Sequence, residues 1–148
     1  MKLAVVNGPN LNMLEYREKD LYGDLSYDQL LDLIDQEISK YPEIQMWESY
    51  QSNSEGELVD FIQGIVIDQF DAIIINPAAY SHYSIAILDA LLMFKGIKVE
   101  VHLSDVMFRE DYRKVLLTKQ ACDHFIYGQG VDSYLKAVQY IVEEYKSK

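Results

Sequence analysis

The chain alternates short apolar segments with amphipathic helical patterns along its whole length, and this alternation limits the folds open to it. The apolar segments predict five β-strands, at 2–7, 44–51, 71–76, 98–102 and 125–127. The third segment is continuous and the most apolar of the five. That pattern is typical of a central strand in a parallel sheet that is covered on both faces.

Helical patterns occupy the segments between these strands and after the last one. They predict helices at 25–40, 54–65, 82–94 and 131–148, with a shorter helical segment at 106–113. Two helices are predicted to begin with a capping box, formed by Ser26 with Gln29 and by Ser54 with Glu57. Strands that alternate with helices through short loops form a doubly wound parallel sheet. We therefore expect a single α/β domain over 1–148, with a flavodoxin-like five-stranded parallel sheet in the order 2-1-3-4-5.

Composition narrows the class of protein. The 148 residues are 49% hydrophobic, enough for a packed core, and no apolar run approaches the roughly 18 residues of a membrane span. The net charge of −11 disfavours binding to nucleic acid or anionic membranes, so an anionic ligand would need a few local cations. The first residues lack a signal-peptide pattern, which favours the cytoplasm. The single cysteine, Cys122, can form neither an intrachain disulfide nor a structural zinc site.

Polar residues follow three of the predicted strands where each strand ends. Asn7-Gly8-Pro9-Asn10 follows the first strand, Asn76-Pro77 follows the third, and Glu100 to Ser104 close the fourth. The carboxyl ends of parallel strands meet at one edge of a sheet, which is where α/β proteins bind their ligands. The sequence therefore predicts a site at this edge.

The residues available at this edge favour acid–base chemistry. The chain has no serine elbow, no cysteine nucleophile and no phosphate-binding loop, and Gly128-Gln129-Gly130 lacks the third glycine of a dinucleotide fingerprint. A metal held by His82, His102 and Glu100 is conceivable but is a weak signal. Tyrosine acts as a base near neutral pH only when a cation stabilises its phenolate, so Tyr22 beside Arg17 is a candidate base. His102 is the candidate acid.

Structural roles explain the same residues about as well when each is considered alone. Tyr22 can pack under its loop, and His102 can be a satisfied histidine at a strand end. Arg109 and Arg113, one helical turn apart, can simply pair with neighbouring carboxylates. Asn12 and Asn76 can cap loop backbones.

Several motifs, taken together and in order, resemble the type II 3-dehydroquinate dehydratases, or 3-dehydroquinases, over nearly the whole chain. The motifs are Asn7-Gly8-Pro9-Asn10-Leu11-Asn12, Arg17-Glu18, Tyr22-Gly23, Gln51-Ser52-Asn53, Glu55-Gly56, Ile75-Asn76-Pro77, Ala79-Tyr80, His82, Glu100-Val101-His102-Leu103-Ser104, Arg109-Glu110 and Arg113. With this resemblance, functional roles for Tyr22 and His102 become the favoured interpretation.

The resemblance implies dehydration of 3-dehydroquinate to 3-dehydroshikimate in the shikimate pathway, by anti elimination through an enolate. It implies no cofactor, and it implies a homo-oligomer, a dodecamer built from trimers. The catalytic residues it implies are Tyr22 as base, Arg17 as the cation beside it, His102 as acid, Glu100 as the residue that orients His102, and Asn12 as the holder of a water.

The resemblance also implies a set of substrate contacts. These are ring and hydroxyl contacts from Asn76, His82 and Arg113, a carboxylate clamp at Leu103 and Ser104, a further contact from Arg109, and Asp89 reaching into the site of a neighbouring subunit.

The chain departs from the usual family pattern around the site. Glu15 and Lys19 flank Arg17 where glycine and proline are common, Ala78 replaces a glycine, and Asp105 replaces an asparagine. Asp105 is expected to weaken substrate binding if its side chain points inward. Two alternatives remain open on the sequence: a catalytically impaired relative that only binds a quinate-like ligand, and a flavodoxin-like response module.

Overall fold

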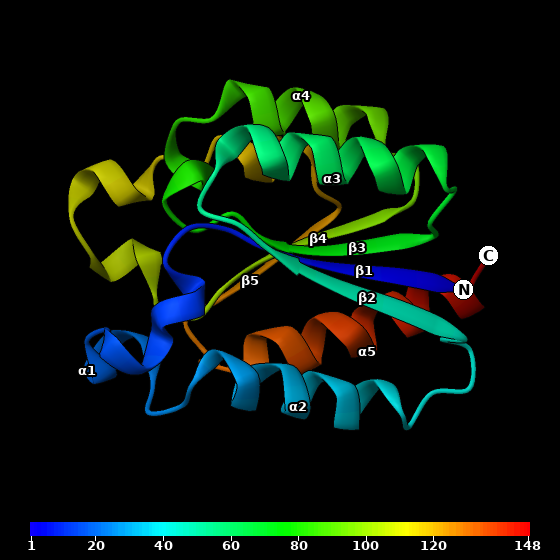
Figure 1. The fold of residues 1–148 in the computed structure, drawn as a ribbon, viewed down its shortest axis with the longest axis horizontal. Coiled ribbons are helices and arrows are strands. Elements are labelled where there is room, and N and C mark those ends of the chain that lie inside the picture. Colours follow the sequence, from blue (N-terminus) through cyan, green and yellow to red (C-terminus); the bar gives the residue numbers. More distant parts are fainter.

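The protein is a three-layer α/β sandwich built on one parallel sheet, as the computed structural model of residues Met1–Lys148 shows (Figure 1). The strand order is β2-β1-β3-β4-β5. The strands are β1 (Lys2–Asn7), β2 (Met46–Gln51), β3 (Ala72–Asn76), β4 (Ile97–His102) and β5 (His124–Tyr127). The predicted flavodoxin-like fold and strand order are therefore confirmed.

Helices cover both faces of the sheet, with α3 and α4 on one side and α2 and α5 on the other (Figure 1). The helices are α1 (Lys19–Tyr22), α2 (Tyr27–Ile38), α3 (Glu55–Ile67), α4 (Ile85–Met93) and α5 (Asp132–Lys146). Five 3-10 segments lie in the loops: η1 (Leu11–Tyr16), η2 (Ala78–His82), η3 (Val106–Phe108), η4 (Asp111–Lys114) and η5 (Thr118–Ala121). No helix has both the length and the apolar character needed to span a membrane.

The core consists of two apolar clusters, one on each face of the sheet. Successive strand side chains point to opposite faces, so Leu3 and Val5 join the cluster under α2 and α5, while Ala4 and Val6 join the cluster under α3 and α4. All four side chains are fully buried. This two-sided burial explains why the strands are continuous apolar runs.

Strand register places the polar strand ends at one level. Asn7 at the end of β1 is opposite Asn76 at the end of β3, and Gly8 follows with a backbone N–H that donates to the Asn76 carbonyl at 2.8 Å. A Cβ on Gly8 would lie 2.5 Å from the carbonyl oxygen of Pro77, so only glycine lets the two loops approach this closely.

Two predicted helical segments differ in detail from the structure. The helix expected over 82–94 begins at Ile85, because the Ser84 side chain caps it by accepting the Ile87 N–H at 3.0 Å, and η2 precedes it. The segment expected over 106–113 is two 3-10 turns, η3 and η4, separated at Arg109, whose backbone is extended.

Candidate active site

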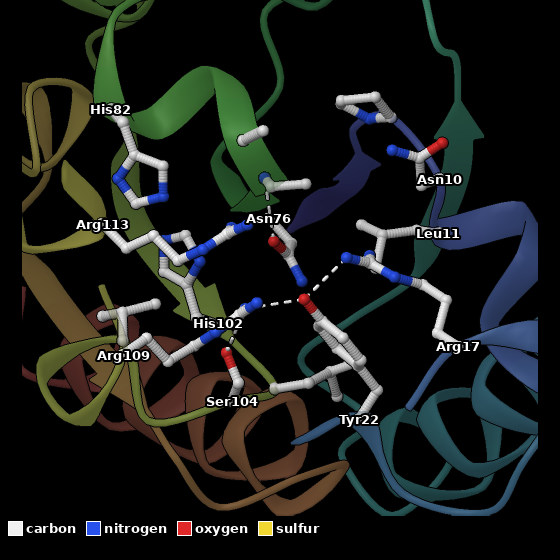
Figure 2. Close-up of a pocket in the computed structure, with 15 residues that line it drawn as sticks. Asn10, Leu11, Arg17, Tyr22, Asn76, His82, His102, Ser104, Arg109 and Arg113 are labelled. Atoms are coloured by element: carbon white, nitrogen blue, oxygen red, sulfur yellow. Dashed lines mark hydrogen bonds between the residues drawn. The ribbon is translucent and has the colours of Figure 1, made fainter. Parts of the chain in front are cut away.

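A pocket lies at the carboxyl ends of the sheet strands, where the polar strand ends were expected to converge (Figure 2). It is lined by Pro9, Asn10, Leu11, Arg17, Tyr22, Asn76, Ala78, Ala79, His82, His102, Leu103, Ser104, Val106, Arg109 and Arg113. The lining thus combines nine of the twelve predicted site residues with loop residues, most of which belong to the motifs named above.

The Tyr22 phenol is held between two guanidinium groups at one side of this pocket (Figure 2). Arg17 Nη2 and Arg109 Nη1 each donate to the phenol oxygen at 2.6 Å. Arg17 also lies over the tyrosine ring, with its Cζ 3.7 Å from the ring centroid. The side chain of Tyr22 is buried, so these two cations are its main electrostatic neighbours.

Both hydrogen bonds to the phenol oxygen come from cations. Guanidinium groups only donate hydrogen bonds and stay protonated, so the Tyr22 oxygen is the acceptor in both contacts and faces two positive charges. The local fold presents the oxygen to the pocket, because Tyr22 ends the short helix α1 and Gly23 turns the chain away with a φ of 84°.

His102 and Glu100 form a buried pair on β4. His102 Nε2 lies 2.8 Å from Glu100 Oε2, and the Glu100 side chain has no exposed surface. An ionised carboxylate only accepts hydrogen bonds, so Nε2 carries a proton and Nδ1 is the nitrogen left for a ligand. Glu100 therefore fixes the orientation of the His102 ring, which lines the pocket.

Asn76 is fixed by hydrogen bonds on both ends of its amide. Its Oδ1 accepts the Ala78 N–H at 3.0 Å, and its Nδ2 donates to the Tyr134 hydroxyl at 2.9 Å. Tyr134 in turn donates to Asn7 Oδ1 at 2.6 Å, and burial raises the pKa of its phenol. Tyr134 therefore stays neutral, and Asn76 keeps one amide proton for the pocket.

His82 and Arg113 lie on the opposite side of the pocket from Tyr22 (Figure 2). The His82 ring is 6.4 Å from the His102 ring, and its Nδ1 contacts the Val115 carbonyl at 2.7 Å. Burial lowers the pKa of His82, with a smaller contribution from the neighbouring His102. His82 is therefore a neutral ring with Nδ1 protonated, which leaves Nε2 as an acceptor.

Arg109 and Arg113 share a carboxylate outside the pocket. Arg113 Nε donates to Glu110 Oε2 at 2.8 Å, and Arg109 Nε lies 3.8 Å from the same oxygen. Arg109 Nη1 also reaches the Ser104 hydroxyl at 3.4 Å, so it links Tyr22 to the end of β4. Leu103 and Ser104 line the pocket beside it.

Three of the predicted site residues do not line the pocket. Asn12 is exposed, with Oδ1 3.4 Å from Gln51 Nε2, and Asp89 is exposed on α4. Glu100 lies behind His102, buried. The expected roles of Asn12 and Asp89 stay predictions, and for Asp89 the prediction concerns the site of another subunit.

The family departures fall at the pocket edge or outside it. Asp105 does not line the pocket, and its side chain caps η3 by accepting the Met107 N–H at 3.1 Å. Lys19 pairs with Asp24 at 3.1 Å on the surface. Ala78 is the exception, because it lines the pocket with a φ of 52°, in the left-handed region that glycine favours.

Sequence reasoning missed the hydroxyl groups that support the site from behind. Ser81, Thr118 and Tyr134 are fully buried and bond to Glu100 or Asn76, yet their sequence context looks like ordinary core or loop. No group of three or more histidine, cysteine, aspartate or glutamate side chains has a geometry that could hold a metal ion.

Comparison with known proteins places this geometry in a family. Residues 1–142 match the family model described as Dehydroquinase class II. The chain belongs to the class II dehydroquinase family. Among curated members, the 3-dehydroquinate dehydratase of Fusobacterium nucleatum subsp. nucleatum is 46% identical over 98% of this chain and 99% of its own. That of Clostridium perfringens strain 13 is 44% identical over the full length of both.

Solved structures of class II dehydroquinases share the fold. The type II dehydroquinase of Butyrivibrio crossotus superposes with a TM-score of 0.91 at 43% identity, covering 95% of this chain and 97% of that one. A 3-dehydroquinate dehydratase-like protein from Bifidobacterium longum superposes with a TM-score of 0.71 at 23% identity, over 99% and 98% of the chains. At that identity the second match supports the fold alone.

Proposed function

We propose that this class II dehydroquinase dehydrates 3-dehydroquinate to 3-dehydroshikimate, the shikimate-pathway step that serves aromatic amino acid biosynthesis. The observation that carries the proposal is the Tyr22 oxygen, which accepts hydrogen bonds from both Arg17 and Arg109 at 2.6 Å on the wall of a pocket that His102 also lines. The site thus pairs a phenol oxygen that is held by two cations with an imidazole that is backed by a carboxylate.

The chemistry needs one base and one acid. The Tyr22 phenolate takes a proton from the carbon next to the substrate ketone, and the electron pair moves onto the ketone oxygen to give an enolate. When the enolate collapses, the bond to the β-hydroxyl breaks and imidazolium His102 donates its proton, so that water leaves. Each of these proton transfers contributes about 10²–10⁴ in rate.

The protonation states of the two catalytic residues must be reset before the next turnover. Tyr22 ends the cycle protonated and His102 neutral, so one proton must pass from the tyrosine to the histidine, directly or through water. No electron is gained or lost overall, and the proposed reaction uses no cofactor.

The remaining residues are proposed to bind the substrate. Asn76 and His82 offer one amide proton and one ring nitrogen to ring hydroxyls, and Arg113 adds a cation. Leu103 and Ser104 at the end of β4 are proposed to hold the carboxylate, because backbone amides bind an anion without adding net charge. Asn12 is proposed to hold a water near the enolate oxygen once the loop closes over the substrate.

Assembly and location complete the proposal. We propose one catalytic domain per chain, a dodecamer of trimers, and a cytoplasmic enzyme. Large hydrophobic side chains that are exposed near the site support an oligomer: Tyr83 just before α4, Ile85 in α4, Phe108 in η3 and Tyr112 in η4. Sedimentation velocity tests the assembly, because a purely monomeric species would contradict it.

The activity assay follows the enone product by its near-ultraviolet absorbance. The wild-type protein is expected to convert 3-dehydroquinate, to resist borohydride because no Schiff base forms, and to lose activity in Tyr22→Phe. Tyr16→Phe is the matched control, since Tyr16 is a neighbouring tyrosine that is 75% exposed and does not line the pocket. Full activity in Tyr22→Phe would refute the mechanism, and tight ligand binding without turnover would favour a binding protein.

A further inference from the structure

The carboxylate of Glu100 is completely buried and is held by side chains from three parts of the chain. An unpaired buried carboxylate is costly, so each of its oxygens needs a hydrogen-bond donor. His102 supplies one donor, through Nε2 at 2.8 Å from Oε2. The other two donors, Ser81 and Thr118, have no role in the mechanism described above.

The two hydroxyl groups donate to different oxygens of the Glu100 carboxylate. Ser81 Oγ donates to Oε2 at 2.7 Å, and Thr118 Oγ1 donates to Oε1 at 2.5 Å. Thr118 Oγ1 also lies 3.3 Å from Ser81 Oγ, but its single proton is used in the shorter contact. Both side chains have no exposed surface, so water cannot replace either hydroxyl without opening the core.

The donors are themselves fixed to one another through the backbone. The Leu117 N–H donates to the Ser81 carbonyl at 2.8 Å, which ties the start of η5 to η2. A rotation of the Glu100 carboxylate would therefore break its bonds to two elements that are already joined. These contacts therefore hold Glu100 Oε2, the oxygen that accepts from His102, in one orientation.

We propose that Ser81 and Thr118 are positioning residues for the general acid, acting through Glu100. By donating to both carboxylate oxygens they fix the orientation of Glu100, so that Oε2 holds Nε2–H of His102 and Nδ1 serves the pocket. The inference rests on the proposed dehydration for its kinetic effect. At metal sites, mutation of the residues that orient a histidine ligand typically costs 10–100-fold in affinity or activity, and we expect an effect of similar size here.

The first test removes one hydroxyl while keeping the side-chain shape. Thr118→Val is expected to lower kcat for 3-dehydroquinate about tenfold or more with little change in KM, and Thr118→Ser is expected to restore it. Ser81→Ala gives the same result through the other oxygen and serves if Thr118→Val folds poorly. A wild-type kcat in both Thr118→Val and Ser81→Ala would overturn the inference.

A matched control separates this role from simple core damage. Ser84 is also buried and donates to a carboxylate, Glu55 Oε2, at 2.6 Å, but it does not contact Glu100. Ser84→Ala is expected to lower stability without lowering kcat. An equal loss of kcat in Ser84→Ala and Ser81→Ala would mean that the effect is structural, and the inference would be wrong.

A double-mutant cycle tests whether Thr118 acts through Glu100. In a Glu100→Gln background, Thr118→Val is expected to have little further effect on kcat, because the carboxylate it positions is already gone. A full multiplicative loss in the double variant would show independent action and would contradict the inference.

A final readout does not depend on turnover. The chain has three histidines, so ¹⁵N-histidine labelling gives few ring signals to assign. The His102 ring signals are expected to shift in Thr118→Val and to return in Thr118→Ser. Unchanged His102 signals in Thr118→Val would overturn the inference whatever the activity, whereas a wild-type protein that does not dehydrate 3-dehydroquinate would overturn only the proposed function.

Discussion

Replacing Ala78 by glycine should stabilise the protein. Ala78 has a φ of 52°, and a left-handed backbone costs a residue with a Cβ about 1–2 kcal/mol. Glycine removes that cost but adds about 0.4–1 kcal/mol of unfolded-chain entropy. The difference predicts that Ala78→Gly raises the free energy of unfolding by about 0.5–1 kcal/mol.

Urea unfolding measures this change through the fluorescence of the single tryptophan, Trp47. With a slope of about 2 kcal/mol per molar urea, the midpoint should rise by about 0.3–0.5 M. Wild type and variant must be compared at one protein concentration, because assembly also raises the apparent stability.

Gln69 provides a matched control away from the site. It has a φ of 56° in the turn between α3 and β3, so Gln69→Gly should give a similar rise. An unchanged or lowered midpoint in Ala78→Gly, together with a raised midpoint in Gln69→Gly, would refute the argument. It would mean that the Ala78 methyl group, which packs at the edge of the core, outweighs its backbone strain.

Three further predictions follow from the geometry. Arg109→Met should lower kcat about 10–100-fold, the value of one hydrogen bond to a charged oxygen, and an unchanged kcat in steady-state assays would exclude a role for Arg109 at Tyr22. Gly8→Ala should lower the free energy of unfolding by about 1–3 kcal/mol, because the added Cβ would collide with the Pro77 backbone. In the same urea assay Gly64→Ala should stabilise helix α3, because a Cβ added there has no atom within 4 Å. Burial lowers the pKa of His82, so just below the ordinary value of 6.5 the unfolded chain binds more protons than the folded one, and the free energy of unfolding should fall as the pH is lowered. His82→Asn should make the urea midpoint depend less on pH between about pH 7 and 5.5, and an identical pH dependence in both proteins would contradict this.

The sequence predicts the sheet well because burial on both faces leaves a strong apolar signal. The strands at 2–7 and 71–76 are recognised from their short apolar runs, and 2-1-3-4-5 is one of the common strand orders of a doubly wound sheet. The contact between Arg17 and Tyr22 was also predictable, because the two residues are five positions apart on one loop.

The partners of the site that come from distant segments could not be predicted in this way. Arg109 reaches the Tyr22 oxygen across 87 residues of sequence, and no local pattern encodes that contact. The 3-10 segments that carry Ser81, Arg113 and Thr118 are too short to show a hydrophobic period. Tyr134 looks like one more apolar residue of α5, although its hydroxyl orients two asparagines.

The net negative charge of the protein acts on an approaching anion at long range, whereas the three arginines of the pocket act on it at short range. At about 0.01 M salt the Debye length is about 30 Å, so the net charge of −11 repels an anion well before it reaches Arg17, Arg109 and Arg113. At about 0.15 M it falls to about 8 Å, and the repulsion is screened while contacts inside the pocket are little affected. Added salt should therefore speed the capture of an anionic substrate, whereas electrostatically steered enzymes slow down.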